Sequence, residues 1–198
     1  MAVISAALVR ELRDKTGAGM MDCKKALSET AGELDKAVDF LRTKGLSAAA
    51  KKAGRATDEG LVFSYIHPGG RVGVLLEINC ESDFVARTDE FQNLCKDIAM
   101  HVAAVAPTTV RRKDFDSSLL EHETEIFKAQ AVESGKPAEI AKKMVAGRIE
   151  KLYKEQVLME QSFVKDPSMT VEELLKTAIS KLGENMSVRR FMRYELGS

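Results

Sequence analysis

The sequence has little cysteine, no excess charge of either sign and no long apolar run. Its three cysteines, Cys23, Cys80 and Cys95, are odd in number and form no CxxC pair. This pattern argues against a disulfide framework or a four-cysteine zinc site and favours a reducing, cytoplasmic location. The 30 basic and 30 acidic residues cancel, so no overall field favours nucleic acid or an anionic membrane. The first residues carry charge by Arg10 and contain no apolar stretch that predicts a signal peptide or a membrane span.

Motifs that would carry catalysis are also missing from the sequence. There is no GxxxxGK[ST] loop, no GxGxxG after a predicted strand and no HExxH. No serine lies in a nucleophile-elbow context. The histidines His67, His101 and His122 fall in a predicted turn and on two different predicted helices, without the spacing of metal ligands. We therefore expect no enzymatic activity, no metal site and no cofactor.

Residues 1–45 predict a module of three short helices. Ser5 is a suitable cap for a first helix whose inner face carries Leu8 and Leu12. A second helix is expected from about Asp22 to Thr30, and a third is expected to end near Gly45. A three-helix unit of this size resembles the ubiquitin-associated fold, which is a small docking module. Residues 46–59 are expected to form a basic, partly helical connector.

Residues 60–198 predict a small antiparallel sheet packed with helices. A hairpin is expected from strands at 61–66 and 72–78, because alternate residues of the second strand are apolar. Helices are expected at 88–105, as a pair within 116–155, and from the capping box at 170–173 to Leu182. The tail is predicted to be a strand that rejoins the hairpin, with one side formed by Val188, Met192, Tyr194 and Leu196. The predicted fold class is α+β.

Two adjacent methionines follow a glycine-rich turn in the segment Thr-Gly-Ala-Gly-Met-Met-Asp-Cys-Lys-Lys-Ala-Leu, residues 16–27. Two large apolar residues at a turn are not both expected to point into a small core, so one of Met20 and Met21 is expected to be left on the surface for binding. The alternative is that both methionines fill the core of the helical module. The physical argument alone favours this alternative.

An aromatic residue lies in the short connection Glu-Ser-Asp-Phe-Val-Ala-Arg, residues 81–87, between a predicted strand and a predicted helix. Such connections run over the surface and often carry function. Phe84 is therefore either tucked under the connection as a plug or offered to a partner as an anchor. The usual burial of aromatic residues favours the plug.

These two segments, together with Lys51-Lys52-Ala53-Gly54 and Glu160-Gln-Ser-Phe-Val-Lys-Asp166, resemble the bacterial translation elongation factor Ts family in its short form. The resemblance implies a nucleotide-exchange factor that binds the GTPase elongation factor Tu, both GDP-bound and nucleotide-free. It implies that Ser82, Asp83, Phe84 and Val85 disturb the Mg²⁺ site of the GTPase, with Phe84 as the wedge. Ser82 stands where the family usually has threonine, and both residues carry a Cβ hydroxyl that can support the turn.

The resemblance also implies that Met20, Met21 and Lys24 dock the helical module on the nucleotide domain. Because the chain has room for one core subdomain only, the resemblance implies a homodimer in a two-plus-two complex with the GTPase. The expected contact is either one apolar face of the sheet or the helices around 120–155. No direct nucleic-acid or membrane contact is expected.

A rival hypothesis is a ribosome- or RNA-associated protein. It would use the basic residues between Arg42 and Arg55 and the triplet Arg111-Arg112-Lys113. The balanced net charge and the absence of aromatic residues among these basic ones argue against it. The basic run is otherwise a solvated linker or a strip that faces a partner.

Overall fold

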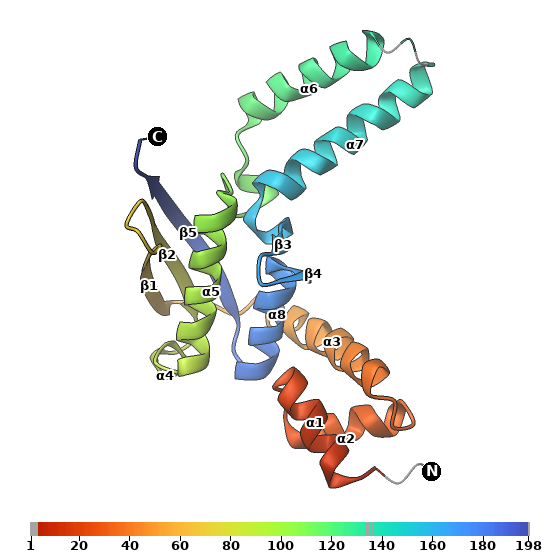
Figure 1. The fold of residues 1–198 in the computed structure, drawn as a ribbon, viewed down its shortest axis with the longest axis vertical. Helices are drawn as coiled ribbons and strands as arrows, with labels where there is room; N and C mark the ends of the chain where they lie inside the picture. The colour runs from red at the N-terminus through yellow and green to blue at the C-terminus, as the bar shows by residue number, and fades with distance from the viewer. Residues whose placement is uncertain (1–3, 134, 136, 198) are drawn as a thin grey trace. The chain divides into compact units, whose positions relative to one another are not determined.

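The computed structural model describes residues 4–133, 135 and 137–197. The chain divides into two compact units. Unit 1 comprises Met1–Leu61, Ile78–Leu94 and Glu173–Ser187, and unit 2 comprises Val62–Glu77, Cys95–Glu172 and Val188–Ser198. The combination of helices with a small antiparallel sheet confirms the predicted α+β class (Figure 1).

The first three helices of unit 1 pack around a shared apolar cluster. They are α1 (Ala6–Thr16), α2 (Met20–Glu29) and α3 (Leu34–Ala50). Ser5 caps α1 as predicted, since its hydroxyl accepts a hydrogen bond from the Leu8 N–H at 3.2 Å. The fully buried residues of the cluster include Leu12, Leu27 and Ala37. The three-helix module is therefore confirmed within the described residues, while its likeness to the ubiquitin-associated fold stays a prediction.

The predicted end of the third helix near Gly45 is wrong, because α3 continues to Ala50. Gly45 is buried, and a Cβ at this position would lie 3.4 Å from the Ser180 hydroxyl of α8 (Val171–Leu182). Gly45 therefore lies inside the helix, where α3 packs against α8, and is not a stop signal. An ion pair of 2.7 Å between Arg42 and Glu173 joins the same two helices.

The three-stranded sheet has the strand order β1 (Glu59–Ile66), β2 (Val72–Cys80) and β5 (Met186–Glu195). The C-terminal strand therefore rejoins the hairpin, as predicted. Val74, Leu76 and Ile78 of β2 are buried. Gly60 has φ +148°, and a Cβ there would lie 2.2 Å from the carbonyl oxygen of Ile78, so this close strand pairing requires glycine.

The predicted apolar side of the tail strand is wrong. Val188 is buried, whereas Met192, Tyr194 and Leu196 are 55–64% exposed. The alternation fails at Arg189 and Arg190, which are both exposed, and the strand presents different faces before and after them.

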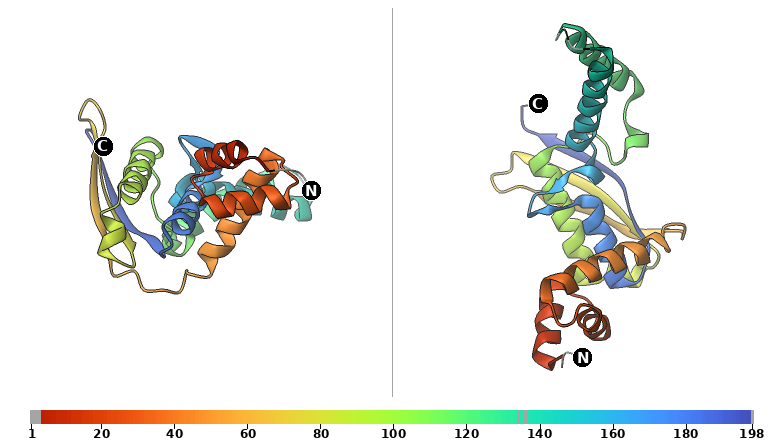
Figure 2. Two further views of the ribbon diagram at one scale, coloured as in Figure 1. Left: turned by 90° about the horizontal axis from the view of Figure 1, so that it is seen from below. Right: turned by 90° about the vertical axis from the view of Figure 1, so that its right-hand side faces the viewer.

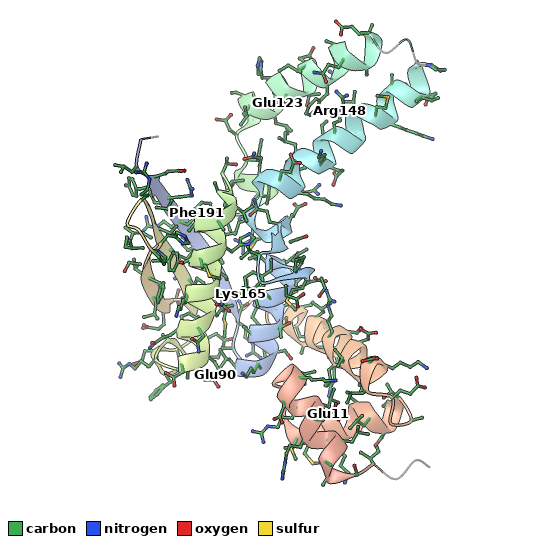
Figure 3. All side chains as sticks on the ribbon, in the orientation of Figure 1. Glu11, Glu90, Glu123, Arg148, Lys165 and Phe191 are labelled. Atoms are coloured by element: carbon green, nitrogen blue, oxygen red, sulfur yellow. The ribbon has the colours of Figure 1, made fainter. Side chains whose placement is uncertain are left out.

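The longest helices of unit 2 form an antiparallel pair, α6 (Ser117–Glu133) and α7 (Ala138–Gln156), which lie side by side in Figures 1 and 2. The predicted helical pair is confirmed in the part of it that the structure describes. Arg148 lies on α7 (labelled in Figure 3), and its guanidinium is 5.7 Å from the ring centroid of Phe127 in α6. The short strands β3 (Ser162–Phe163) and β4 (Asp166–Thr170), which are not predicted from the sequence, pair antiparallel.

α5 (Asp89–Val105) carries the predicted apolar stripe, including the buried residues Phe91, Ile98 and Val102. Within unit 2, the guanidinium Nε of Arg193 in β5 donates to the Ala103 carbonyl of α5 at 3.2 Å. Among the described residues, none of the helices has the length and apolarity needed to cross a membrane.

Candidate functional site

The segment 82–85 forms the start of a one-turn helix, α4 (Asp83–Ala86), where an irregular loop was predicted. Ser82 is its N-cap, and its hydroxyl accepts a hydrogen bond from the Val85 N–H at 3.5 Å. Ala86 is buried and anchors the inner side of the turn, while Phe84 is 80% exposed on the outer side. The plug hypothesis for Phe84 is therefore wrong in this structure, and the ring is available to a partner.

The flanks of the turn are also held by hydrogen bonds. The Arg87 guanidinium donates to the Asp83 carboxylate at 2.7 Å, and this is a surface pair of the kind that contributes little to stability. The Thr88 hydroxyl donates to the Val85 carbonyl at 2.8 Å and accepts from the Phe91 N–H at 3.3 Å. Thr88 thereby starts α5, as predicted, and connects the turn to a long helix.

A second segment of unit 1 lies against this turn. The Glu184 carboxylate, directly after α8, accepts hydrogen bonds from the Ser82 N–H at 3.0 Å and the Ser82 hydroxyl at 2.6 Å. The Glu81 carboxylate accepts from the Asn185 N–H at 2.6 Å and lies 3.4 Å from the Arg55 guanidinium. Sequence reasoning missed Glu184 and Glu81, because nothing local in the sequence indicates that residues about a hundred positions apart will meet.

The Cys80 thiol completes the support of the turn from the inside. It donates to the Ser82 carbonyl at 3.1 Å, and the side chain is buried. Burial raises the pKa of the Cys80 thiol above its usual value, and the nearby Glu184 charge raises it further. The thiol therefore stays protonated and acts as a hydrogen-bond donor, which is a structural role.

The predicted docking residues lie together in the first turns of α2. Met20 is 43% exposed and Met21 is 77% exposed, so the expectation that one of them packs inside is wrong, and so is the alternative that both do. The turn Gly17-Ala18-Gly19 ends just before them, and the helix begins at Met20. Cys23, Ala26 and Leu27 supply the inner face of this helix instead. Lys24 is exposed on the outer face.

No group of three or more His, Cys, Asp or Glu side chains that could hold a metal ion occurs in the part of the chain that the structure describes. His101 is buried, accepts from the Val164 N–H through Nδ1 at 3.2 Å and lies 2.9 Å from the Gln161 amide oxygen through Nε2. This geometry places the proton on Nε2. His101 therefore has a structural role within unit 2.

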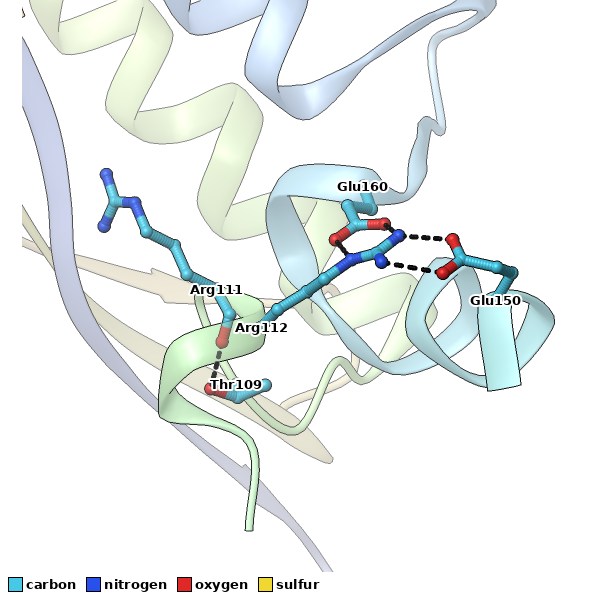
Figure 4. Close-up of polar contacts among 5 residues, drawn as sticks. All are labelled: Thr109, Arg111, Arg112, Glu150 and Glu160. Atoms are coloured by element: carbon cyan, nitrogen blue, oxygen red, sulfur yellow. Dashed lines mark hydrogen bonds and ion pairs between the residues drawn. The ribbon is translucent and has the colours of Figure 1, made fainter. Parts of the chain in front are cut away.

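Two of the basic residues that the rival RNA hypothesis would use, Arg111 and Arg112, are bonded within the folded protein. The Arg112 guanidinium lies between the carboxylates of Glu150 and Glu160 and donates to both (Figure 4). The carboxylates of Glu160 and Glu150 raise the pKa of the Arg112 guanidinium above its usual value, and the guanidinium lowers the pKa of the Glu150 carboxyl. Arg111 donates to the Val188 carbonyl at 3.1 Å.

Three of the five basic residues between Arg42 and Arg55 also form ion pairs with carboxylates. Ion pairs join Arg42 to Glu173, Lys44 to Asp22 and Arg55 to Glu81. These ion pairs reduce the uncompensated charge that the two basic segments offer to phosphates.

The fold and the site define an α+β protein that presents an anchored, exposed aromatic side chain, which is an arrangement suited to binding another protein. The model of the elongation factor TS family matches residues 28–198. Elongation factor Ts of Geobacter sulfurreducens is 61% identical over 194 residues, which are 98% of this chain and 90% of that protein. Elongation factor Ts of Desulforamulus reducens is 59% identical over 197 residues, which are 100% of this chain and 91% of that protein. The chain belongs to the elongation factor Ts family.

Proposed function

We propose that this protein is a guanine-nucleotide exchange factor for elongation factor Tu and that Phe84 is its principal contact with the GTPase. The observation that supports this most directly is the 80% exposure of Phe84 on a turn held by hydrogen bonds. An exposed aromatic ring on a fixed support has little conformational entropy to lose when it enters a pocket. Membership of the elongation factor Ts family identifies the partner.

The proposed mechanism needs no catalytic side chain. A P-loop GTPase holds its nucleotide through backbone amides, a lysine and a Mg²⁺ ion that bridges phosphate oxygens. Phe84 enters between helices of the partner near this Mg²⁺ site, and Asp83 contacts the partner beside it. Because the factor binds the nucleotide-poor conformation more tightly than the GDP-bound one, it weakens GDP binding by the same ratio. It stays bound until GTP enters.

In the same proposal, the outer face of α2 docks on the nucleotide domain. Met20 and Met21 supply exposed, adaptable apolar contacts, and Lys24 supplies a positive charge on the same face. This contact adds affinity, whereas the 82–85 turn acts on the nucleotide site.

We also propose that two copies associate through the open face of the sheet. Six apolar side chains on this face in unit 2 are 48–71% exposed. They are Val62, Ile66, Leu75, Met192, Tyr194 and Leu196. Several of them line one open hollow together with Ser64 and Gly73. A contiguous apolar face of this kind marks an interaction site, and a twofold contact covers it on both copies at once.

Release of labelled GDP from purified elongation factor Tu, with and without this protein, tests the proposal. We expect faster release that saturates with the concentration of the factor. An unchanged rate of GDP release at all concentrations would contradict the proposal. Binding to RNA that falls steeply with salt, together with no effect on GDP release, would favour the rival hypothesis instead.

A further inference from the structure

We infer that Glu184 is a positioning residue for nucleotide exchange, which holds the 82–85 turn in the conformation that presents Phe84. This inference rests on the proposed function. Glu184 does not have to touch the partner, because it acts through Ser82.

Every polar atom of Ser82 is engaged in the structure. Its N–H and its hydroxyl donate to the two oxygens of the same Glu184 carboxylate, at 3.0 Å and 2.6 Å. Its carbonyl accepts from the Cys80 thiol at 3.1 Å and from the Ala86 N–H at 3.3 Å. Because the hydroxyl proton points to Glu184, an oxygen lone pair remains free for the Val85 N–H. The carboxylate thereby fixes the cap that starts the turn.

Glu184 is itself placed by rigid backbone on both sides. Gly183 has φ +82°, and its N–H donates to the Ile179 carbonyl at 3.0 Å, which ends α8 directly before Glu184. The next residue, Asn185, is buried. Its N–H donates to the Glu81 carboxylate and its side chain to the Arg55 carbonyl at 2.8 Å. The carboxylate therefore has a defined position to which the turn adapts.

A one-turn helix has too few internal hydrogen bonds to be stable alone, so its order depends on such outside contacts. Without the carboxylate, α4 exchanges among conformations, and only a fraction of molecules offers Phe84 in the productive one. In a complex that is already docked through α2, the maximal rate of GDP release then falls by that fraction, and the apparent affinity of the turn for the partner falls as well. Loss of two charge-assisted hydrogen bonds is of the order that changes an equilibrium about tenfold or more.

The test is the rate of GDP release from elongation factor Tu at increasing concentrations of the full-length factor. Glu184→Ala is expected to lower the maximal rate about tenfold. Glu184→Gln is expected to be intermediate, because its amide oxygen still accepts from the Ser82 N–H. Glu139→Ala, on the exposed surface of α7, removes the same charge and is expected to match the wild type.

A double-mutant comparison separates positioning from a general loss of stability. If Glu184 acts through Ser82, adding Ser82→Ala to Glu184→Ala changes the maximal rate little, although Ser82→Ala alone lowers it. Additive effects would overturn the inference, as would a wild-type maximal rate in Glu184→Ala. If Glu184→Ala does not fold, Glu184→Gln and Ser82→Ala decide the outcome, and wild-type rates in both would overturn the inference.

Amide hydrogen exchange of the free protein supplies a readout that needs no partner. Glu184→Ala is expected to speed exchange of the amides at 82–86, with the amides of α1 unchanged. Unchanged protection at 82–86 would overturn the inference. Failure of the proposed function looks different, because wild-type protein would then not stimulate GDP release at all, or Phe84→Ala would be as active as wild type.

Discussion

The variant Phe84→Ala tests whether the ring contacts a partner or supports the fold. A partner contact predicts a loss of exchange activity, whereas a structural role predicts a loss of stability. Phe84 is 80% exposed, so about one fifth of the ring is buried. Truncating a fully buried Phe costs about 3–5 kcal/mol, and one fifth of that is about 0.6–1 kcal/mol. For a chain of this length such a loss lowers the melting temperature by about 1–4 °C. Removing a central aromatic anchor from an interface costs about 2 kcal/mol or more, which is roughly thirtyfold in rate or affinity.

The assay combines thermal melting of the free variant with stimulated GDP release from elongation factor Tu. We expect Phe84→Ala to melt close to wild type and to lose most of its stimulation. Phe91→Ala is the matched control, since this Phe lies seven positions further on and is fully buried. It should melt more than about 6 °C below wild type, because the full cost of truncation applies. The reasoning is refuted if Phe84→Ala melts as low as Phe91→Ala while its folded fraction stimulates release normally.

Three further changes test other parts of the structure. Lys24→Glu should weaken binding to elongation factor Tu without changing helix content by circular dichroism, and an unchanged dissociation constant would remove this charge from the mechanism. Burial lowers the pKa of His101 below 6.5, so the unfolded chain binds a proton that the folded chain does not, and stability should fall as pH drops below about 6.5. Urea unfolding at pH 7.5 and 5.5 should show a larger loss for wild type than for His101→Gln. Ile66→Lys, on the open sheet face, should convert a dimer to a species near 21.8 kDa in sedimentation, and wild-type sedimentation at 21.8 kDa with a fully active one-to-one complex would disprove the dimer.

Local signals in the sequence predict most of the elements. Ser5 as a cap, the alternation of Val74, Leu76 and Ile78, and the helix from about 170 to Leu182 each follow from signals within a few residues, and each of these predictions is confirmed. The errors arise where distant residues meet. Gly45 is a helix breaker by its own propensity, yet α3 continues through it to Ala50 and packs against α8, which lies more than a hundred residues further along the chain.

The candidate site, too, depends on contacts between residues that lie far apart in the sequence. Burial statistics favour a hidden Phe84 and hidden methionines, because apolar residues are usually inside. Their exposure depends on which neighbours already fill the core, namely Ala86 beneath the turn and Cys23, Ala26 and Leu27 beneath α2. These neighbours are set by the tertiary structure and cannot be read from the local sequence. Only the resemblance to a family predicts that Phe84 faces a partner. Glu184 carries no local signal at all.

Basic side chains and large apolar side chains on the surface differ in whether the fold provides them with a partner. The basic residues that a sequence reading sets apart, such as Arg42, Arg55 and Arg112, are each paired with a carboxylate in the folded protein. The large apolar residues at 84 and 21, in contrast, are left uncovered although exposing them costs solubility. Pairing weakens the attraction of these residues for nucleic acid, whereas burial of the uncovered apolar side chains by a protein partner would be favourable. The distribution of both kinds of surface therefore favours a protein-binding factor over an RNA-binding one.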